Sequence, residues 1–192
     1  MNNPVGRENV ISAGNQQERL IEIGWVIGFV DGEGCFSIGF VNQNDRQEPS
    51  RIRRGYTTGY QVNHKFAVTQ GEKSLKSLVR LKRYCGVGNI YINRRHDNHK
   101  EHLYNYSVQN REDLRTVIIP FFQKYPLRTA KNNDFKKFVQ VMEIVNHNQH
   151  KDPIGLIKIV NIAKTMNRQK PRESIIRILR DHAPTSMKVD KI

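Results

Sequence analysis

The chain has 192 residues, which suits one domain of ordinary size with its own hydrophobic core. It carries 32 Lys and Arg residues against 18 Asp and Glu residues, a net charge of +14. A charge this far from neutrality predicts a polyanionic partner, DNA or RNA. An anionic membrane surface is disfavoured as the partner, because the basic residues do not line one amphipathic helix.

The N-terminal residues carry no targeting or membrane signal. Residues 1–16 are polar and without apolar period, so we expect a flexible leader and no secretory signal. The longest apolar stretch, Ile21 to Val30, is too short to cross a bilayer. We therefore expect an intracellular protein, in a bacterial cytoplasm or an organelle (mitochondrion or chloroplast), that is not secreted.

Helical spacing through Leu20, Ile23 and Ile27 predicts a helix over 17–31, ending at the glycines of DGEG. The segment CFSIGFVNQ, 35–43, alternates between apolar and polar residues and predicts a half-buried strand. A polar, basic loop follows through Gly55, and residues 58–70 alternate again, predicting a second strand.

Further helices and a hairpin follow. Helical spacing predicts a helix over 72–84, and Gly86-Val87-Gly88 ends it. Strands near 88–95 and 102–109 then flank the turn HDNHKE as a hairpin. Helices are expected at 111–122 as far as Pro120, at 131–147, from Pro153 to Met166 and at 173–182. We expect one domain over 17–183 and a flexible tail over 184–192.

This order predicts an α+β fold, an antiparallel sheet saddle covered on one face by helices. The uncovered face is polar and basic. It is either simply solvated or a surface for the DNA major groove, where Arg and Lys read guanine and Asn and Gln read adenine. The candidate DNA-binding residues are Ser37, Gln43, Arg51, Arg53, Gln61, Asn63, Lys65, Tyr91, Asn93, Arg95, Asn105 and Ser107.

The segment WVIGFVDGEG, 25–34, carries the strongest chemical signal. It is an apolar helix that ends in two carboxylates, Asp31 and Glu33. A carboxylate at the negative end of a helix dipole is unfavourable without a cation, which points to a metal. A helix C-cap followed by a turn is the alternative, because glycine is common there. Gly24 and Gly28 fall on one helix face, where a second helix could approach closely.

Cysteine and histidine spacing favours no other metal site. Cys35 and Cys85 lack zinc-ligand spacing, and two thiols indicate a reducing compartment. We expect Cys35 to be a packing residue and not a nucleophile. His96, His99 and His102 are spaced three apart, but histidines at a hairpin turn are usually only polar, so a metal there and a small-molecule enzyme are both disfavoured.

The nine residues from Val26 to Gly34 resemble the LAGLIDADG motif of homing endonucleases, with Glu33 at a position where Asp is more usual. The segments FAVTQ (66–70), CGVGNIY (85–91), PFFQKYPLRTAKNNDF (120–135) and GLIKIVNIAKTMN (155–167) are similar to later parts of the family, so the resemblance covers about residues 18–170. It implies the homing endonuclease fold, αββαββα plus C-terminal helices. One motif copy implies a homodimer packed through Gly24 and Gly28.

The resemblance implies a site-specific homing endonuclease that makes a metal-dependent staggered double-strand break in a long, near-palindromic DNA target. Glu33 and the Gly32 carbonyl would bind Mg²⁺, with Mn²⁺ or Ca²⁺ able to substitute for binding. Gln70 would position water and Lys131 would offset charge on the phosphate. The family's second basic position falls on Ser74, so Lys73 beside it is the candidate.

The alternative is a non-cleaving relative of the same fold, an intron maturase or transcription regulator, for which host intron RNA becomes a partner. Relatives that lose cleavage often lose the metal-ligand acid, so the presence of Glu33 favours the enzyme.

Overall fold

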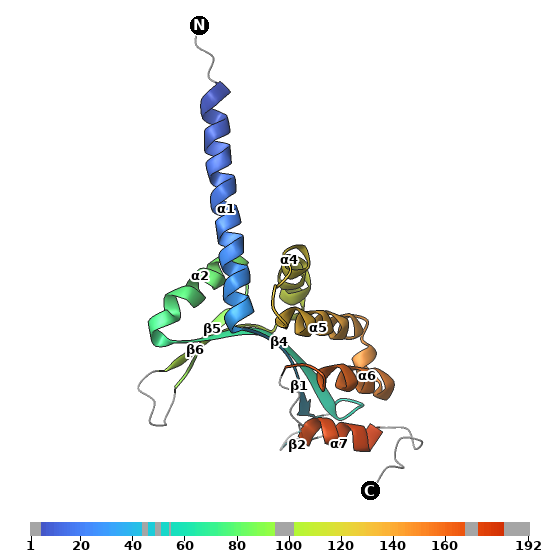
Figure 1. Ribbon diagram of the computed structural model, residues 1–192. Coiled ribbons are helices and arrows are strands. Elements are labelled where there is room, and N and C mark those ends of the chain that lie inside the picture. Colours follow the sequence, from blue (N-terminus) through green and yellow to red (C-terminus); the bar gives the residue numbers. More distant parts are fainter. Residues whose placement is uncertain are drawn as a thin grey trace.

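The computed structural model describes residues 5–43, 46–48, 51–53, 55–94, 102–167 and 173–182. Helix α1 projects far beyond the rest of the molecule, and the other helices pack around a curved sheet (Figure 1). The elements are α1 (Val5–Glu33), β1 (Gly34–Asn42), β2 (Arg46–Glu48), β3 (Arg51–Arg53), β4 (Tyr60–Gly71), η1 (Glu72–Ser74), α2 (Leu75–Cys85), β5 (Asn89–Asn93), β6 (Leu103–Val108), α3 (Arg111–Asp113), η2 (Leu114–Ile118), α4 (Ile119–Lys124), α5 (Lys131–Asn146), η3 (Gln149–Lys151), α6 (Pro153–Ala163) and α7 (Glu173–His182).

The main sheet has four antiparallel strands in the order β1-β4-β6-β5, which confirms the predicted α+β class. Residues opposite each other in neighbouring strands share a face of the sheet. On one face Phe36 lies opposite Phe66 and is fully buried with it. The centroid of the Phe36 ring is 5.0 Å from the ring centroid of Phe66 and 5.0 Å from that of Phe135 in α5. This is therefore the face that the helices cover.

Each covering helix adds an apolar stripe to the core, as the helical spacing in the sequence predicts. The fully buried residues include Leu78 of α2, Leu114 of η2, Phe138 of α5 and Leu156 of α6. The predicted helices at 72–84, 131–147, 153–166 and 173–182 are confirmed with small shifts at their ends.

Helix α1 is longer than the sequence predicted. It begins at Val5, inside the expected irregular leader, and continues to Glu33. Figure 1 shows its N-terminal part standing clear of the sheet, and a helix with no protein surface beside it needs no apolar stripe. The division into a 1–16 leader, a 17–183 domain and a 184–192 tail stays a prediction, and residues 183–192 lie outside the described residues. No described helix has the length and apolar character to span a bilayer.

The predicted loop after β1 contains two short paired strands. Strands β2 and β3 pair antiparallel, with Arg46 opposite Arg53 and Glu48 opposite Arg51. The sequence predicted a polar, basic loop through Gly55 and did not predict these two strands. Sequence alternation identifies a strand by its buried face, and this short polar stretch has no apolar alternation to reveal one.

The helical segment that starts at Arg111 continues through Pro120 to Lys124, although the sequence predicted its end at Pro120. A proline within a helix lacks the backbone donor and its ring meets a carbonyl of the preceding turn. Just before this proline the chain is π-helical, and the Ile119 N–H donates to the Leu114 carbonyl, five residues back. The wider turn moves the carbonyl that the proline ring would otherwise meet, which lets the helix continue past Pro120.

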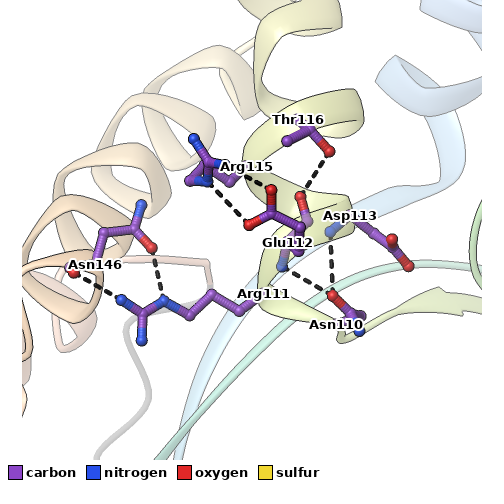
Figure 2. Close-up of polar contacts among 7 residues, drawn as sticks. All are labelled: Asn110, Arg111, Glu112, Asp113, Arg115, Thr116 and Asn146. Atoms are coloured by element: carbon purple, nitrogen blue, oxygen red, sulfur yellow. Dashed lines mark hydrogen bonds and ion pairs between the residues drawn. The ribbon is translucent and has the colours of Figure 1, made fainter.

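The start of this segment is fastened at two points (Figure 2). The side-chain oxygen of Asn110 accepts hydrogen bonds from the backbone N–H groups of Glu112 at 2.8 Å and Asp113 at 3.2 Å, as an N-cap residue does. Arg111 donates from Nε to Oδ1 of Asn146 at 2.8 Å and from a terminal nitrogen to its carbonyl oxygen at 2.7 Å. Arg111 thus ties α3 to the end of α5.

Candidate active site

The motif residues lie at the end of helix α1. Glu33 is its last residue and is exposed, as is Gly32. The last turn of α1 has no basic residue of its own, so the negative end of its dipole needs a cation from elsewhere. The Nζ of Lys131 lies 3.0 Å from the Val30 carbonyl oxygen and 3.1 Å from that of Gly32. The fold therefore brings Lys131 to Gly32, 99 positions away in the chain, beside Glu33.

The second motif carboxylate, Asp31, points to a loop and not to the exposed end of the helix. Its Oδ2 accepts a hydrogen bond from the Arg128 N–H at 2.7 Å. Its Oδ1 accepts from the Thr129 N–H at 3.2 Å and the Thr129 hydroxyl at 2.8 Å. The two carboxylates, separated by one glycine, thus have different surroundings. Asp31 accepts hydrogen bonds from a loop of the same chain, and Glu33 faces solvent.

Charge and burial act against each other in this cluster. Partial burial lowers the pKa of Lys131, although the nearby charges of Asp31 and Glu33 oppose the shift. Burial acts to raise the pKa of Asp31, but the hydrogen bonds from Arg128 and Thr129 and the charge of Lys131 outweigh it, so this pKa is lowered. Asp31 is accordingly an anion at neutral pH, which suits its role as a triple acceptor.

Cys35 is exposed, so the expectation that it is a packing residue was wrong. It lies opposite Ala67 in the β1–β4 register, one position out of phase with the buried Phe36. Its thiol lies 3.7 Å from Oδ1 of Asn167. Asn167 also donates from Nδ2 to the Phe36 carbonyl at 3.2 Å and from its backbone to Asp134 at 3.1 Å.

Asn167 is a site-adjacent residue that the sequence reasoning missed. Its φ of 55° is left-handed, and asparagine is one of the residues that adopt this conformation after a helix. An Asn following the helical stripe of 153–166 was the available signal.

The remaining catalytic candidates lie on other elements than Glu33, Gln70 on β4 and Lys73 on η1. Gln70 lies opposite Tyr104 near the end of β4, out of phase with Thr69, and so on the helix-bearing side of the sheet. Lys73 borders a cleft of about 770 Å³ between α1 and α2, together with Glu22 and Arg80. The roles assigned to Gln70 and Lys73 stay predictions.

One chain offers few ligands for a divalent metal. Within the described residues no three His, Cys, Asp or Glu side chains gather at one point. Glu33 supplies an exposed carboxylate and Gly32 a carbonyl oxygen, both hard oxygen donors of the kind Mg²⁺ prefers. Mg²⁺ keeps several waters when bound, so this donor set fits an open site completed by oxygens from outside the chain. His96 and His99 lie outside the described residues, and His102 is half-buried.

The sheet face away from the helices carries the predicted DNA-binding residues. The pairing register gives one face to Ser37, Gln61, Asn63, Lys65, Tyr91, Asn93, Asn105 and Ser107. Gln43, just after β1, joins them, because its Nε2 donates to Oε1 of Gln61 at 3.3 Å. A hollow of about 500 Å³ on this face is lined in part by Ser37, Asn63 and Lys65. These side chains thus share one face of the sheet.

Some of these candidates differ in accessibility. Asn63, Tyr91 and Asn93 are exposed, whereas Ser107 is only 4% exposed. Ser107 belongs to β6, which lies between β4 and β5, where a small side chain is covered by its neighbours. Arg51 and Arg53 belong to β3, and Arg95 lies outside the described residues.

The predicted contact face of α1 is open. Leu20 and Ile21 are 55% and 60% exposed. Gly24 and Gly28 are also exposed, and a methyl group added at either would meet no atom within 4 Å. Apolar and small residues thus form an uncovered helix face.

Sequence comparison identifies relatives of this chain. The sequence pattern of the LAGLIDADG endonuclease family matches residues 26–142. The chain is 36% identical over 145 residues to "Probable intron-encoded endonuclease 3" of Neurospora crassa and 30% identical over 153 residues to "Probable intron-encoded endonuclease Cox1-I1b" of Schizosaccharomyces pombe. These alignments cover 74% and 77% of this chain but 24% and 34% of those proteins. The chain therefore spans about a quarter to a third of these relatives.

Structural comparison agrees. The homing endonuclease I-TnaI superposes with a TM-score of 0.67 at 34% identity, covering 83% of this chain and 96% of that one. The LAGLIDADG homing endonuclease I-SmaMI, bound to cleaved DNA, superposes with a TM-score of 0.65 at 30% identity, covering 83% of this chain and 48% of that one. The predicted homing endonuclease fold is confirmed, and the chain belongs to the LAGLIDADG endonuclease family.

Proposed function

We propose that this chain is a site-specific DNA endonuclease that hydrolyses phosphodiester bonds with a divalent metal. The observation that carries the proposal is the contact of Lys131 with the Gly32 carbonyl, 3.1 Å, beside the exposed Glu33. A carboxylate can bind a catalytic metal, and an ammonium can stabilise charge that develops on the phosphate, so both groups suit metal-assisted phosphodiester hydrolysis.

Glu33 and the Gly32 carbonyl would hold the metal, for which Mg²⁺ is our choice. When bound, the metal supplies Lewis-acid activation of water and phosphate. I-SmaMI has been solved with an uncleaved DNA target in the presence of calcium ions, which supports Ca²⁺ as a metal that permits binding. Lys131 would approach the phosphate undergoing attack and offset its developing negative charge. Gln70 would orient water, and Lys73 is our candidate for the second basic group.

The polar sheet face would bind the target in the major groove. Asn63 and Asn93 are exposed there, and amide side chains recognise adenine through paired hydrogen bonds. I-SmaMI has been solved on DNA, which supports double-stranded DNA as the partner. The net charge of +14 supplies affinity for the phosphate backbone.

Two copies of the chain would form the complete enzyme. The exposed Leu20, Ile21, Gly24 and Gly28 offer a helix face on which a second α1 could pack closely. A two-fold dimer places one Glu33 on each DNA strand, which accounts for a staggered double-strand break in a long, near-palindromic site.

The names of the relatives support an intron-encoded origin. They also keep the alternative relevant, a non-cleaving maturase or regulator that binds intron RNA or DNA. The two functions differ in hydrolysis, and Glu33 favours the endonuclease.

The test is incubation of the protein with a plasmid library of long randomised sites in Mg²⁺. The endonuclease proposal predicts that a discrete pool of plasmids becomes linear. If the protein binds DNA or RNA tightly and cuts nothing with Mg²⁺ or Mn²⁺, the maturase or regulator takes its place.

A further inference from the structure

We propose that Asp31 is a positioning residue for Lys131: its carboxylate clamps the loop before α5 and so keeps the Lys131 ammonium on the Gly32 carbonyl, beside Glu33. The inference rests on the proposed function, because it assumes that Lys131 acts in cleavage. It gives the first motif carboxylate a task distinct from that of the second.

The clamp consists of three hydrogen bonds onto one half-buried carboxylate. Each Asp31 oxygen is used: Oδ2 by the Arg128 N–H and Oδ1 by both the N–H and the hydroxyl of Thr129. These residues are 97 and 98 positions from Asp31, so the bonds join two distant parts of the chain. Charge-assisted hydrogen bonds of this kind are stronger than neutral ones, which makes the carboxylate an effective anchor for the loop.

Thr129 passes the constraint on to helix α5. Its hydroxyl accepts a hydrogen bond from the Lys131 N–H at 3.3 Å, and its carbonyl accepts one from the Asn132 N–H at 3.1 Å. The residue at the N-cap, Ala130, has no side chain that can cap α5. The first turn of α5 is therefore held by Thr129, which Asp31 holds in turn.

The Lys131 side chain reaches back to α1, the helix that carries Asp31. A lysine stem is flexible, so the position of its backbone decides which oxygens the ammonium can reach. With the clamp in place those oxygens are the carbonyls of Val30 and Gly32. Without it the loop and the first turn of α5 lose the three Asp31 hydrogen bonds to α1, and the ammonium is less firmly fixed relative to Glu33.

The experiment compares wild type with Asp31→Asn, which keeps the shape of the side chain but removes the charge and one acceptor oxygen. We expect the single-turnover cleavage rate at saturating DNA in Mg²⁺ to fall by about 10- to 100-fold, because misplacement of a catalytic group by about 1 Å has an effect of that size. Affinity for uncut DNA, measured in Ca²⁺, is expected to change by less than about threefold, since the sheet face is untouched.

Asp152→Asn is the matched control. Asp152 is also a carboxylate that accepts a backbone hydrogen bond at a helix start, from the Gly155 N–H at 2.8 Å. Asp152 lies at the beginning of α6. The end of α6 is the one that leads to Asn167, beside Cys35, so Asp152 is at the helix end away from the site. We expect this variant to lower the melting temperature without lowering the cleavage rate.

A double-mutant cycle separates positioning from a merely structural role. In a Lys131→Met background there is no ammonium to position, so Asp31→Asn should cause no further loss of rate. Thr129→Ala should lower the rate severalfold, and Thr129→Ser, which keeps the hydroxyl, should restore it. This pair applies the same criterion if Asp31→Asn fails to fold by circular dichroism.

The possible failures are distinguishable. If wild type cuts no DNA, the proposed function fails and the inference with it. If wild type cuts and Asp31→Asn cuts at the same rate, or loses as much rate in the Lys131→Met background as in wild type, the inference alone is overturned.

Discussion

The ammonium of Lys131 lies 3.1 Å from the carbonyl oxygen of Gly32, the residue immediately before the exposed Glu33. Through this contact a cation from α5 stabilises the negative end of the α1 helix dipole. It also fixes a positive charge beside the carboxylate before DNA arrives. A charge that is positioned in advance stabilises a developing anion without further reorganisation. A metal held by the same carbonyl would have to share it with this ammonium.

Replacing Lys131 by methionine removes the charge and keeps most of the stem. We expect the cleavage rate at saturating DNA to fall by about 100- to 1,000-fold, the size typical for loss of one group that stabilises transition-state charge. The measurement is single-turnover cleavage of a site selected from the library. Lys137→Met is the matched control, because Lys137 also donates to a carbonyl near the end of a helix, that of Thr165 at 2.8 Å. Wild-type cleavage by Lys131→Met would contradict the catalytic role.

Gly28→Ala tests the dimer face. An added methyl group meets no atom within 4 Å in one chain, and alanine favours a helix over glycine by about 0.8–1 kcal/mol. We therefore expect the monomer to gain stability while dimerisation weakens, because the methyl group separates two closely packed helices. Sedimentation equilibrium and thermal melting measure the two effects.

Gly155→Ala is the contrasting control for this pair of measurements. There an added Cβ would collide with the Gln149 carbonyl, so stability should fall without a direct effect on the α1 face. A Gly28→Ala protein that dimerises as tightly as wild type would show that the contact lies elsewhere.

Lys65 on the free sheet face is expected to contact the target. If Lys65→Ala removes one phosphate contact, the slope of log affinity against log salt concentration should fall by about 1. Titrations of labelled DNA in Ca²⁺ at several salt concentrations measure this slope. Lys158→Ala, an exposed lysine on helix α6, is the control and should leave it unchanged. Equal slopes for Lys65→Ala and wild type would remove Lys65 from the phosphate contacts.

Stability is expected to fall as the pH drops below about 6.5, the ordinary pKa of histidine. Burial, and then the charge of Arg111, lower the pKa of both His64 and His150. Each has a buried Nδ1 without a hydrogen-bond partner within the described part of the chain. A histidine with a lowered folded-state pKa binds protons more readily when unfolded, so acid favours unfolding.

Urea unfolding at pH 7.5 and 5.5 measures this dependence. His64→Leu should reduce the loss of unfolding free energy between the two pH values by on the order of 1 kcal/mol. The same loss in wild type and His64→Leu would exclude His64 as its source.

Much of the fold could be predicted because local patterns record burial. Phe36 and Phe66 belong to strands in which apolar and polar residues alternate, and Leu78 belongs to an apolar helical stripe. Each of these residues therefore indicates which face of its element is buried. The family resemblance identified Glu33 and Lys131 as catalytic candidates. The partners of Asp31 could not be predicted, because Arg128 and Thr129 meet it only after distant segments have folded together. The sequence of strands β2 and β3 and of residues 5–16 in α1 has no apolar periodicity from which these elements could be predicted.

The burial of Ser107 needed the sheet order, which no local pattern contains. Strand β6 has a neighbour on both sides, Ala67 of β4 and Asn89 of β5 being its partners at this position.

The most direct measurement is single-turnover cleavage of a selected DNA site in Mg²⁺ by wild type and Glu33→Gln, with binding of the same site measured in Ca²⁺. The amide keeps the shape of the side chain and removes the charge that binds metal. The prediction is that wild type cuts both strands, whereas Glu33→Gln binds the site and leaves both strands intact. Cleavage by Glu33→Gln at the wild-type rate would contradict a metal-dependent reaction centred on Glu33.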